Sequence, residues 1–470
     1  MNTWYEKAVF YHMYPLGMTG APKQNDSTDI IHRFEELDKW IPHIRDLGCT
    51  AVYIGPLFES SSHGYDTRDY KITDRRLGDN NDFIRFVSLC HENGIKVVVD
   101  GVFNHTGREF FAFRDIQEKK WDSPYKDWYK GVRFDWGSPL GDPFAYEAWH
   151  GIADLPTLNL QNPEVKTYLF DVIRYWVDTF DIDGIRLDCA NVLDFQFMKE
   201  MRAAVSSMKE DFWLMGEVIH GDYARWVNPE MLHSVTNYEL HKSLYSGHND
   251  HNYFEIAHNV RRLEAIGREL YTFVDNHDED RIASKLNLQD HLFPIHLLLF
   301  TLPGIPSIYY GSEWEISGKR TNTCDDMLRP AIHPEEFEER NCLLTEQIKK
   351  LAHIHLEHQA FHRGKYKELF LTNRQYAFSR TGEAETVAIA VNNDEKECTI
   401  SIPVDSCFTA AQELLGGLTI PVENGRLNIE LPAADGKILK LLRPEEISLE
   451  KNSLKENILI EGSPQDKGKI

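Results

Sequence analysis

Eight short apolar segments alternate with amphipathic helical stretches between Val9 and Gly311, and this alternation limits the fold more than any other feature. Strands that alternate with helices form parallel sheets, and eight such units predict a (β/α)8 barrel. Apolar residues recur at helical spacing in Ile30–Leu47, Asp82–Asn93 and Pro163–Phe180. The eight predicted strands are Val9–Pro15, Ala51–Pro56, Lys96–Val102, Gly184–Cys189, Phe212–Val218, Ser234–Leu240, Leu270–His277 and Ile305–Gly311.

The alternation is interrupted once and ends once, which predicts further domains. Residues 106–160, after the third predicted strand, hold no clear βα unit and are rich in aromatic residues, Gly, Pro and Asp. A long insertion of this kind usually forms a wall of an active site. From Lys365 on, short runs of alternating apolar and polar residues predict an antiparallel β-sandwich. The predicted organisation is residues 1–105 as the first part of the barrel, 106–160 as an inserted domain, 161–364 as the second part of the barrel, 365–444 as the sandwich and 445–470 as a charged tail.

The composition and charge of the chain argue against several classes of protein. The 470 residues carry a net charge of −23, which argues against a nucleic-acid partner or an anionic membrane surface. The N-terminus has no basic region followed by an apolar one, so the sequence predicts a cytoplasmic protein. The most apolar stretch, His291–Tyr310, contains prolines and histidines, and a buried helix followed by a strand is expected there. Seven cysteines without a CxxC pair are expected to be reduced and mostly buried.

Four of the predicted strands deliver a carboxylate at or just past their C-terminal ends. The segments are KVVVDGVFNH, DGIRLDCANV, FWLMGEVIHGD and LYTFVDNHDEDR, and their acids are Asp100, Asp188, Glu217 and Asp278. Any one of these acids could merely cap the helix that follows its strand. The C-terminal ends of parallel barrel strands lie at one face, however, so all four together predict one acid-rich site.

The sequence around two of these acids suggests that one is ionised and the other can carry a proton. Arg186 and Asp188 lie two residues apart on a strand and point the same way, so the guanidinium would keep the carboxylate ionised. Glu217 lies in an apolar run, where burial would raise its pKa and suit it to general acid catalysis. One ionised and one protonatable carboxyl are what glycosidic cleavage needs. A metal-dependent hydrolase remains an alternative, because carboxylates also bind metals.

At this point the motifs resemble those of a known family. DGVFNH, GIRLDCANV, GEV and FVDNHD are similar to the four conserved regions of the α-amylase family, glycoside hydrolase family 13. DLPTLNL resembles its fifth region, and HGYDTRDY and GIPSIYYGSEW resemble the segments at the second and eighth strands. The resemblance covers Val9–Arg329 and implies an α/β fold: a (β/α)8 TIM barrel with an inserted domain B after strand 3 and a C-terminal antiparallel β-sandwich.

The resemblance also implies roles for individual residues. Asp188 would be the nucleophile, Glu217 the general acid/base and Asp278 the third carboxylate of a retaining double displacement. The residues expected to bind the substrate are Tyr65, Asp100, His105, Arg186 and His277. No cofactor is implied except calcium, which many members bind through an asparagine that matches Asn104, with Asp142 and Asp154 nearby as further oxygen ligands.

One group within the family is most similar. LPTLN is close to the MPKLN motif of cyclomaltodextrinases, neopullulanases and maltogenic amylases, which implies cleavage of α-1,4 bonds in maltodextrins and cyclodextrins. The implied partner is an α-glucan oligosaccharide, with no nucleic acid, no membrane and a possible homodimer. Three features depart from this group: the sequence begins at the first barrel strand rather than with an additional N-terminal domain, Val192 replaces a glutamate, and Ile219–His220 replaces a Trp-His pair.

Three alternatives stay open at this stage. A 4-α-glucanotransferase shares the fold and the covalent intermediate, so the motifs do not separate it from a hydrolase. An oligo-1,6-glucosidase would share the acids but cleave a different bond. A non-catalytic sugar-binding protein is disfavoured, because such relatives lose at least one catalytic acid and this chain retains Asp188, Glu217 and Asp278.

Overall fold

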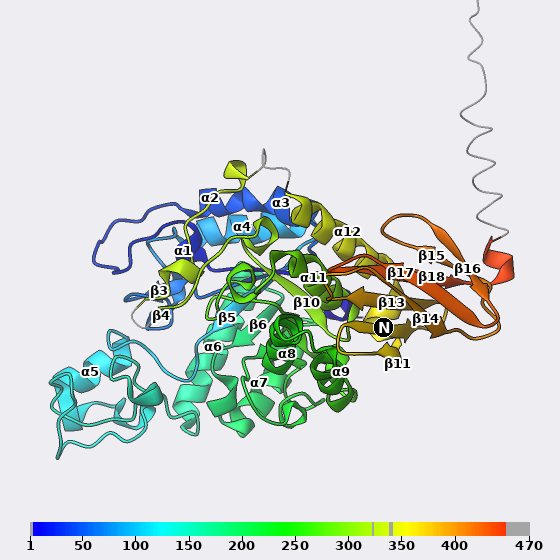
Figure 1. Cartoon of the computed structure of the whole chain (residues 1–470). Coiled ribbons are helices and arrows are strands. Elements are labelled where there is room, and N and C mark those ends of the chain that lie inside the picture. Colours follow the sequence, from blue (N-terminus) through cyan, green and yellow to red (C-terminus); the bar gives the residue numbers. More distant parts are fainter. Residues whose placement is uncertain (1–2, 322–323, 338–341, 448–470) are drawn as a thin grey trace, which may run out of the picture.

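The computed structural model of the protein describes residues 3–321, 324–337 and 342–447. Its central element is a parallel sheet with the strand order β8-β7-β6-β5-β2-β1-β10-β9. A parallel bridge between Thr236 and Tyr271 joins the two outer strands and brings the sheet to barrel form. The predicted (β/α)8 fold is confirmed (Figure 1). The strands are β1 (Phe10–Met13), β2 (Ala51–Ile54), β5 (Lys96–Gly101), β6 (Gly184–Leu187), β7 (Trp213–Gly216), β8 (Ser234–Val235), β9 (Tyr271–Phe273) and β10 (Ile305–Tyr309).

Most of the helices surround the barrel (Figure 1). In α6, the capping oxygen of Asn162 accepts from the Glu164 amide and Pro163 occupies the first turn, as its sequence predicted. The α-helices are α1 (Pro15–Met18), α2 (Phe34–Asp38), α3 (Trp40–Asp46), α4 (Asn80–Glu92), α5 (Phe111–Lys119), α6 (Pro163–Phe180), α7 (Phe195–Met208), α8 (Tyr238–Asn249), α9 (Tyr253–Arg262), α10 (Ile282–Lys285), α11 (Leu292–Thr301), α12 (Leu343–Glu357) and α13 (Gln359–Arg363).

Two predicted elements have different limits. Ile30–Leu47 was predicted as one helix, but it forms α2 and α3, which meet at Lys39. Pro42 has no amide hydrogen to donate to the carbonyl of Asp38, so the helical hydrogen bonds are interrupted there. The strand predicted at Ser234–Leu240 is only two residues long, because the Asn237 side chain caps α8 by accepting from the Leu240 amide at 3.0 Å.

Residues 106–160 extend from the barrel beyond β5, on the side where α5 is drawn in Figure 1. Apart from α5 and short 3-10 turns, this insert is held by isolated antiparallel bridges such as His105–Thr157 and Tyr129–Leu158. Its aromatic residues pack on one another: the ring centroids of Phe113 and Tyr129 lie 5.2 Å apart. The bridge at His105 ties the insert directly to the end of β5. A hairpin that the sequence did not indicate, β3 (Phe58–Ser60) with β4 (Thr67–Thr73), lies beside it.

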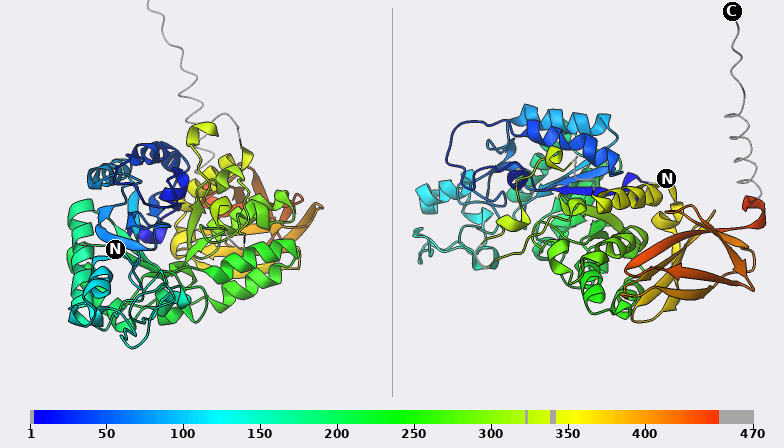
Figure 2. Two further views of the ribbon diagram at one scale, coloured as in Figure 1. Left: turned by 90° about the vertical axis from the view of Figure 1, so that its left-hand side faces the viewer. Right: turned by 45° about the horizontal axis from the view of Figure 1, so that its top comes forward.

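The C-terminal part is an antiparallel sheet system on the opposite side of the barrel from the insert (Figures 1 and 2). Its inner face forms an apolar cluster of its own, which includes Ala388, Ile402, Leu427 and Leu439. The predicted sandwich is confirmed, and residues 448–470 of the predicted tail lie outside the described part. The strands are β11 (Lys365–Leu371), β12 (Gln375–Thr381), β13 (Thr386–Asn392), β14 (Cys398–Pro403), β15 (Ala410–Glu413), β16 (Thr419–Glu423), β17 (Arg426–Leu431) and β18 (Asp435–Leu442).

Two further predictions concern the apolar stretch and the cysteines. His291–Tyr310 forms the buried helix α11 followed by β10, as expected. None of the helices in the described ranges has the length and apolar character needed to cross a bilayer. All seven cysteines are free, but only Cys49, Cys90 and Cys189 are buried, so the prediction of mostly buried thiols is wrong. Cys324, Cys342 and Cys398 are partly buried and Cys407 is exposed.

Candidate active site

One buried arginine holds three of the four predicted acids together at the C-terminal end of the barrel strands. Nη1 of Arg186, on β6, lies 2.9 Å from an oxygen of Asp100 and 2.9 Å from Oδ1 of Asp188. Its Nη2 lies 2.8 Å from Oε1 of Glu217. Adjacent parallel strands bring the groups together: Asp100 pairs with Arg186 across β5 and β6, and Asp188 and Glu217 each follow one member of the Leu187–Gly216 pair at the ends of β6 and β7. Three of the four acids that were predicted to form one site therefore meet at this arginine.

The cluster carries more negative than positive charge. Three carboxylates share one guanidinium, so a proton on one of them relieves repulsion. Burial, opposed by Arg186, raises the pKa of Glu217 to about 7 and that of Asp100 to about 6. A carboxyl at Glu217 with this raised pKa can hold a proton near neutral pH, as a general acid must. Asp100 accepts a further hydrogen bond from the Tyr53 hydroxyl at 2.9 Å.

Asp278 lies in a different environment, in the loop after β9. Its Oδ1 accepts from Arg329 Nη2 at 2.8 Å, and its Oδ2 lies 3.1 Å from Nε2 of His277. His277 in turn contacts the Tyr65 hydroxyl at 2.6 Å, and the two rings are nearly parallel with centroids 5.9 Å apart. Burial lowers the pKa of His277 well below its ordinary value, so the imidazole is neutral. Tyr65 and His277, predicted to bind substrate, thus form a continuous ring surface next to Asp278.

His105 approaches the nucleophile candidate from the insert side. A ring nitrogen of His105, a carboxylate oxygen of Asp188 and the sulfur of Cys189 lie within 4.8 Å of one another. Nε2 of His105 is buried without a hydrogen-bond partner among the described residues, so it is available to a ligand. The ring of Trp149, in the insert, lies 5.7 Å from that of His105. Every site residue that the sequence predicted is therefore at this end of the barrel.

One of the candidate calcium ligands, Asp142, already has a positively charged partner. The side-chain nitrogen of Asn104 lies 3.2 Å from Nδ1 of His105, and Asn104 is buried. Both oxygens of Asp142 are occupied: Oδ1 accepts from Arg108 Nη2 at 2.6 Å and from Gln117 Nε2 at 2.7 Å, and Oδ2 accepts from the Tyr146 hydroxyl at 3.2 Å. A guanidinium on the same oxygen repels a second cation. Asp142 is thus an ion-pair partner of Arg108, and no step of the chemistry is assigned to calcium.

Four residues of the site were missed by sequence reasoning. Tyr53 and Cys189 contact acids directly, Arg329 binds Asp278 from far along the chain, and the Tyr238 hydroxyl lies 3.5 Å from Glu217. Cys189 follows Asp188 directly and could have been found from that adjacency. Arg329 carries no local signal, because only the fold brings it to Asp278.

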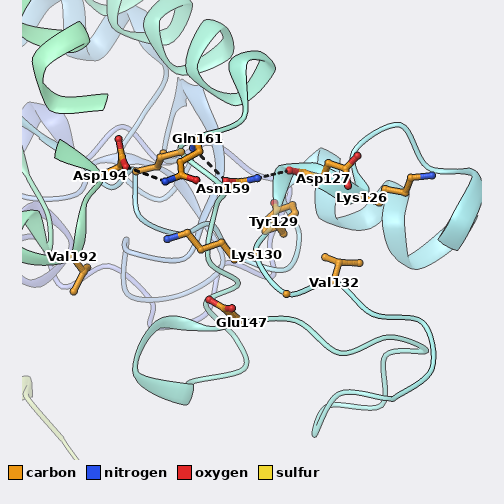
Figure 3. Close-up of a pocket in the computed structure, with 12 residues that line it drawn as sticks. Lys126, Asp127, Tyr129, Lys130, Val132, Glu147, Asn159, Gln161, Val192 and Asp194 are labelled. Atoms are coloured by element: carbon orange, nitrogen blue, oxygen red, sulfur yellow. Dashed lines mark hydrogen bonds between the residues drawn. The ribbon is translucent and has the colours of Figure 1, made fainter. Parts of the chain in front are cut away.

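A separate hollow lies between the insert and the loop after β6 (Figure 3). It has a volume of about 550 Å³ and a polar lining that includes Lys130, Glu147, Asn159 and Asp194. Val192, the residue that departs from the glutamate of the most similar group, is part of this lining. Val192 follows Asp188 by four residues along the chain.

Comparison with known families decides the classification. Residues 37–353 match the family described as "Alpha amylase, catalytic domain", and residues 364–439 match the family described as "Alpha-amylase C-terminal domain". The chain belongs to the α-amylase family of glycoside hydrolases. The resemblance inferred from the motifs is confirmed over the barrel, and the sandwich corresponds to the family's C-terminal domain.

Curated relatives and solved structures agree. A cyclomaltodextrinase of Thermoanaerobacter pseudethanolicus is 31% identical, with 84% of this chain and 71% of the relative aligned. Neopullulanase 2 of Thermoactinomyces vulgaris is 32% identical over 93% of this chain and 78% of its own. Among solved structures, the cyclic α-maltosyl-(1→6)-maltose hydrolase of Arthrobacter globiformis superposes with a TM-score of 0.79 at 26% identity, covering 94% of this chain and all of that chain.

Proposed function

We propose that the protein is a retaining α-glucan hydrolase that cleaves α-1,4-glucosidic bonds of maltodextrins and cyclodextrins. The observation that carries this proposal is the Arg186 cluster, which holds Asp188 and Glu217 side by side with a single positive charge. Relatives named cyclomaltodextrinase, neopullulanase and maltogenic α-amylase support the substrate class. A relative named intracellular maltogenic amylase, from Bacillus subtilis and 33% identical, supports a cytoplasmic location.

The first half of the reaction uses the difference between the two acids. Asp188, held by Arg186, attacks the anomeric carbon and forms a covalent glycosyl ester. Glu217 gives its proton to the leaving glycosidic oxygen, as its raised pKa of about 7 allows near neutral pH. The released glucan fragment departs with that proton, and Glu217 is left ionised.

The second half reverses these roles. Glu217, now a base, takes a proton from water, and the water oxygen attacks the glycosyl ester on the anomeric carbon. The bond to Asp188 breaks and the sugar leaves with retained configuration. His105 Nε2, the neutral His277 and Asp278 are the groups that hold the sugar hydroxyls during both steps, with Tyr65 stacked beneath the ring.

The experiment is a time course of products from maltotriose, maltoheptaose, β-cyclodextrin, pullulan and isomaltose, with Glu217→Gln as the control. We expect shorter maltodextrins from the linear and cyclic α-1,4 substrates and none from the control. Products longer than the substrate would instead identify a 4-α-glucanotransferase. Cleavage of isomaltose alone would identify an α-1,6-glucosidase and overturn the proposal.

A further inference from the structure

Cys189 makes an unusual contact with the neighbouring acid. Its sulfur donates to Oδ2 of Asp188 at 2.8 Å, while Oδ1 of Asp188 accepts from Arg186 at 2.9 Å. Neighbouring residues on a strand point to opposite faces, so this contact needs a change of direction. Cys189 provides it with a left-handed backbone (φ 48°, ψ 39°), two residues after β6 ends. The turn brings the thiol back onto the carboxylate.

A third donor faces this pair. His105 is 1% exposed, and its Nε2 is buried with no hydrogen-bond partner in the part of the chain that the structure describes. A ring nitrogen of His105, an Asp188 oxygen and the Cys189 sulfur lie within 4.8 Å of one another. That this imidazole nitrogen has no partner is a separate observation, which does not depend on the contact between the thiol and Asp188. It leaves a polar atom of His105 without a hydrogen-bond partner among the described residues, as a ligand-binding nitrogen would be.

The three donors form a set suited to a particular class of ion. Imidazole, thiolate and carboxylate are the ligands of tetrahedral zinc, whereas calcium and magnesium prefer oxygen alone. Ligand atoms at about 2.0–2.3 Å from zinc stand about 3.3–3.8 Å apart. Small rotations of the His105 and Cys189 side chains would bring atoms now within 4.8 Å to that spacing.

We propose that His105, Asp188 and Cys189 form an inhibitory binding site for a thiophilic divalent cation such as Zn²⁺. On binding, the S–H bond of Cys189 breaks, a sulfur–metal bond forms and the proton passes to solvent. Oδ2 of Asp188 and the free nitrogen of His105 complete three positions, and water takes the fourth. No oxidation or reduction is involved.

This ion would compete with the substrate, and here the inference rests on the proposed function. Asp188 cannot attack a sugar while its oxygen is bound to a metal. His105 cannot hold a sugar hydroxyl with a nitrogen that binds the ion. Inhibition should therefore be reversible and relieved both by chelation and by high concentrations of maltodextrin.

The metal site is tested without turnover. Cd²⁺ bound to a thiolate gives an ultraviolet charge-transfer band, so Cd²⁺ is titrated into the protein and into Cys189→Ala and His105→Ala. Loss of a zinc-type ligand should weaken Cd²⁺ affinity at least about tenfold, since even residues that only support ligands contribute that much. The matched control carries Ser at the four partly exposed or exposed cysteines, Cys324, Cys342, Cys398 and Cys407, and should keep the band.

A band that persists in Cys189→Ala, or disappears in the four-cysteine control, would overturn the metal site. Inhibition of maltoheptaose cleavage by Zn²⁺ provides the second measurement, each variant being compared with its own metal-free rate. The inhibition constant should be at least about tenfold weaker in Cys189→Ala than in the unsubstituted protein. An unchanged inhibition constant would mean that zinc acts elsewhere.

Competition with the sugar is tested in Glu217→Gln, which holds maltoheptaose without cleaving it. Saturating maltoheptaose should raise the apparent Kd for Cd²⁺ at least about tenfold, as expected for shared ligands. A Cd²⁺ affinity that is unchanged with maltoheptaose bound would refute the overlap of the two sites. Failure of maltoheptaose to bind, with the Cd²⁺ band intact, would instead count against the proposed function.

Discussion

Replacing Glu217 by Gln should change stability in a pH-dependent way. The pKa of Glu217 is raised from 4.5 to about 7, mainly by burial. A raised carboxyl pKa means that the folded state holds its proton more tightly than the unfolded state. The stability it contributes is complete below about pH 4.5 and is lost as pH rises through about 7. With about 1.4 kcal/mol per pH unit, the loss by pH 8 is about 3 kcal/mol.

Gln cannot ionise and does not suffer this loss. It does leave an amide NH₂ facing either Arg186 or the Cys189 amide, both of which now donate to Glu217. That cost does not depend on pH, so the informative quantity is the difference between two pH values. For 470 residues the unfolding entropy is about 1 kcal/mol/K, so 3 kcal/mol corresponds to about 3 °C.

The assay is scanning calorimetry of both proteins at pH 5 and pH 8. The Tm of Glu217→Gln minus that of the unsubstituted protein should be about 3 °C more positive at pH 8 than at pH 5. Glu210→Gln, at an exposed position, serves as the control and should show no such change. Equal differences at the two pH values, or a more negative one at pH 8, would refute the account of a buried proton on Glu217.

Three further predictions concern activity and calcium. The kcat/KM for maltoheptaose should fall about tenfold per pH unit above about pH 7, because Glu217 loses the proton it donates; a flat profile to pH 9 would contradict this. Arg329→Met should lower kcat/KM by about 10- to 100-fold through loss of the charge-assisted bond to Asp278, with Arg329→Lys intermediate; steady-state kinetics with circular dichroism as a folding control decide it. EGTA should leave Tm unchanged, since Arg108 occupies Asp142; a fall of several degrees that calcium reverses would show a site that this ion pair does not block.

The barrel could be predicted from sequence because its strands are buried on both faces and read as apolar runs. The acids could be predicted to meet because the C-terminal ends of parallel strands share one face. The limits of elements were harder, as Pro42 interrupts one helix and Asn237 ends a strand by capping the next helix. Pro42 removes one hydrogen bond and Asn237 adds one, and the periodicity of the sequence reveals neither.

The contacts of each acid were harder to predict from the sequence than its position at the end of a strand. Arg186 was expected to accompany Asp188, but its contacts to Asp100 and Glu217 depend on the spacing of adjacent strands. Arg329 reaches Asp278 across more than fifty residues of chain, and no sequence period connects them. The contact of Cys189 with Asp188 depends on the left-handed backbone conformation of Cys189. L-amino acids other than glycine seldom adopt this conformation, and the sequence does not indicate it.

The most direct test of the central claim is to trap the covalent intermediate. Glu217→Gln is mixed with α-maltosyl fluoride, whose leaving group needs no protonation, and the digested protein is analysed by mass spectrometry. Asp188 should be glycosylated, and the ester should accumulate because water is no longer activated. The account predicts a peptide containing Asp188 that is heavier by one maltosyl group. An adduct on Asp278 instead, or fluoride release without any adduct and with inverted product, would contradict the assignment of Asp188 as nucleophile.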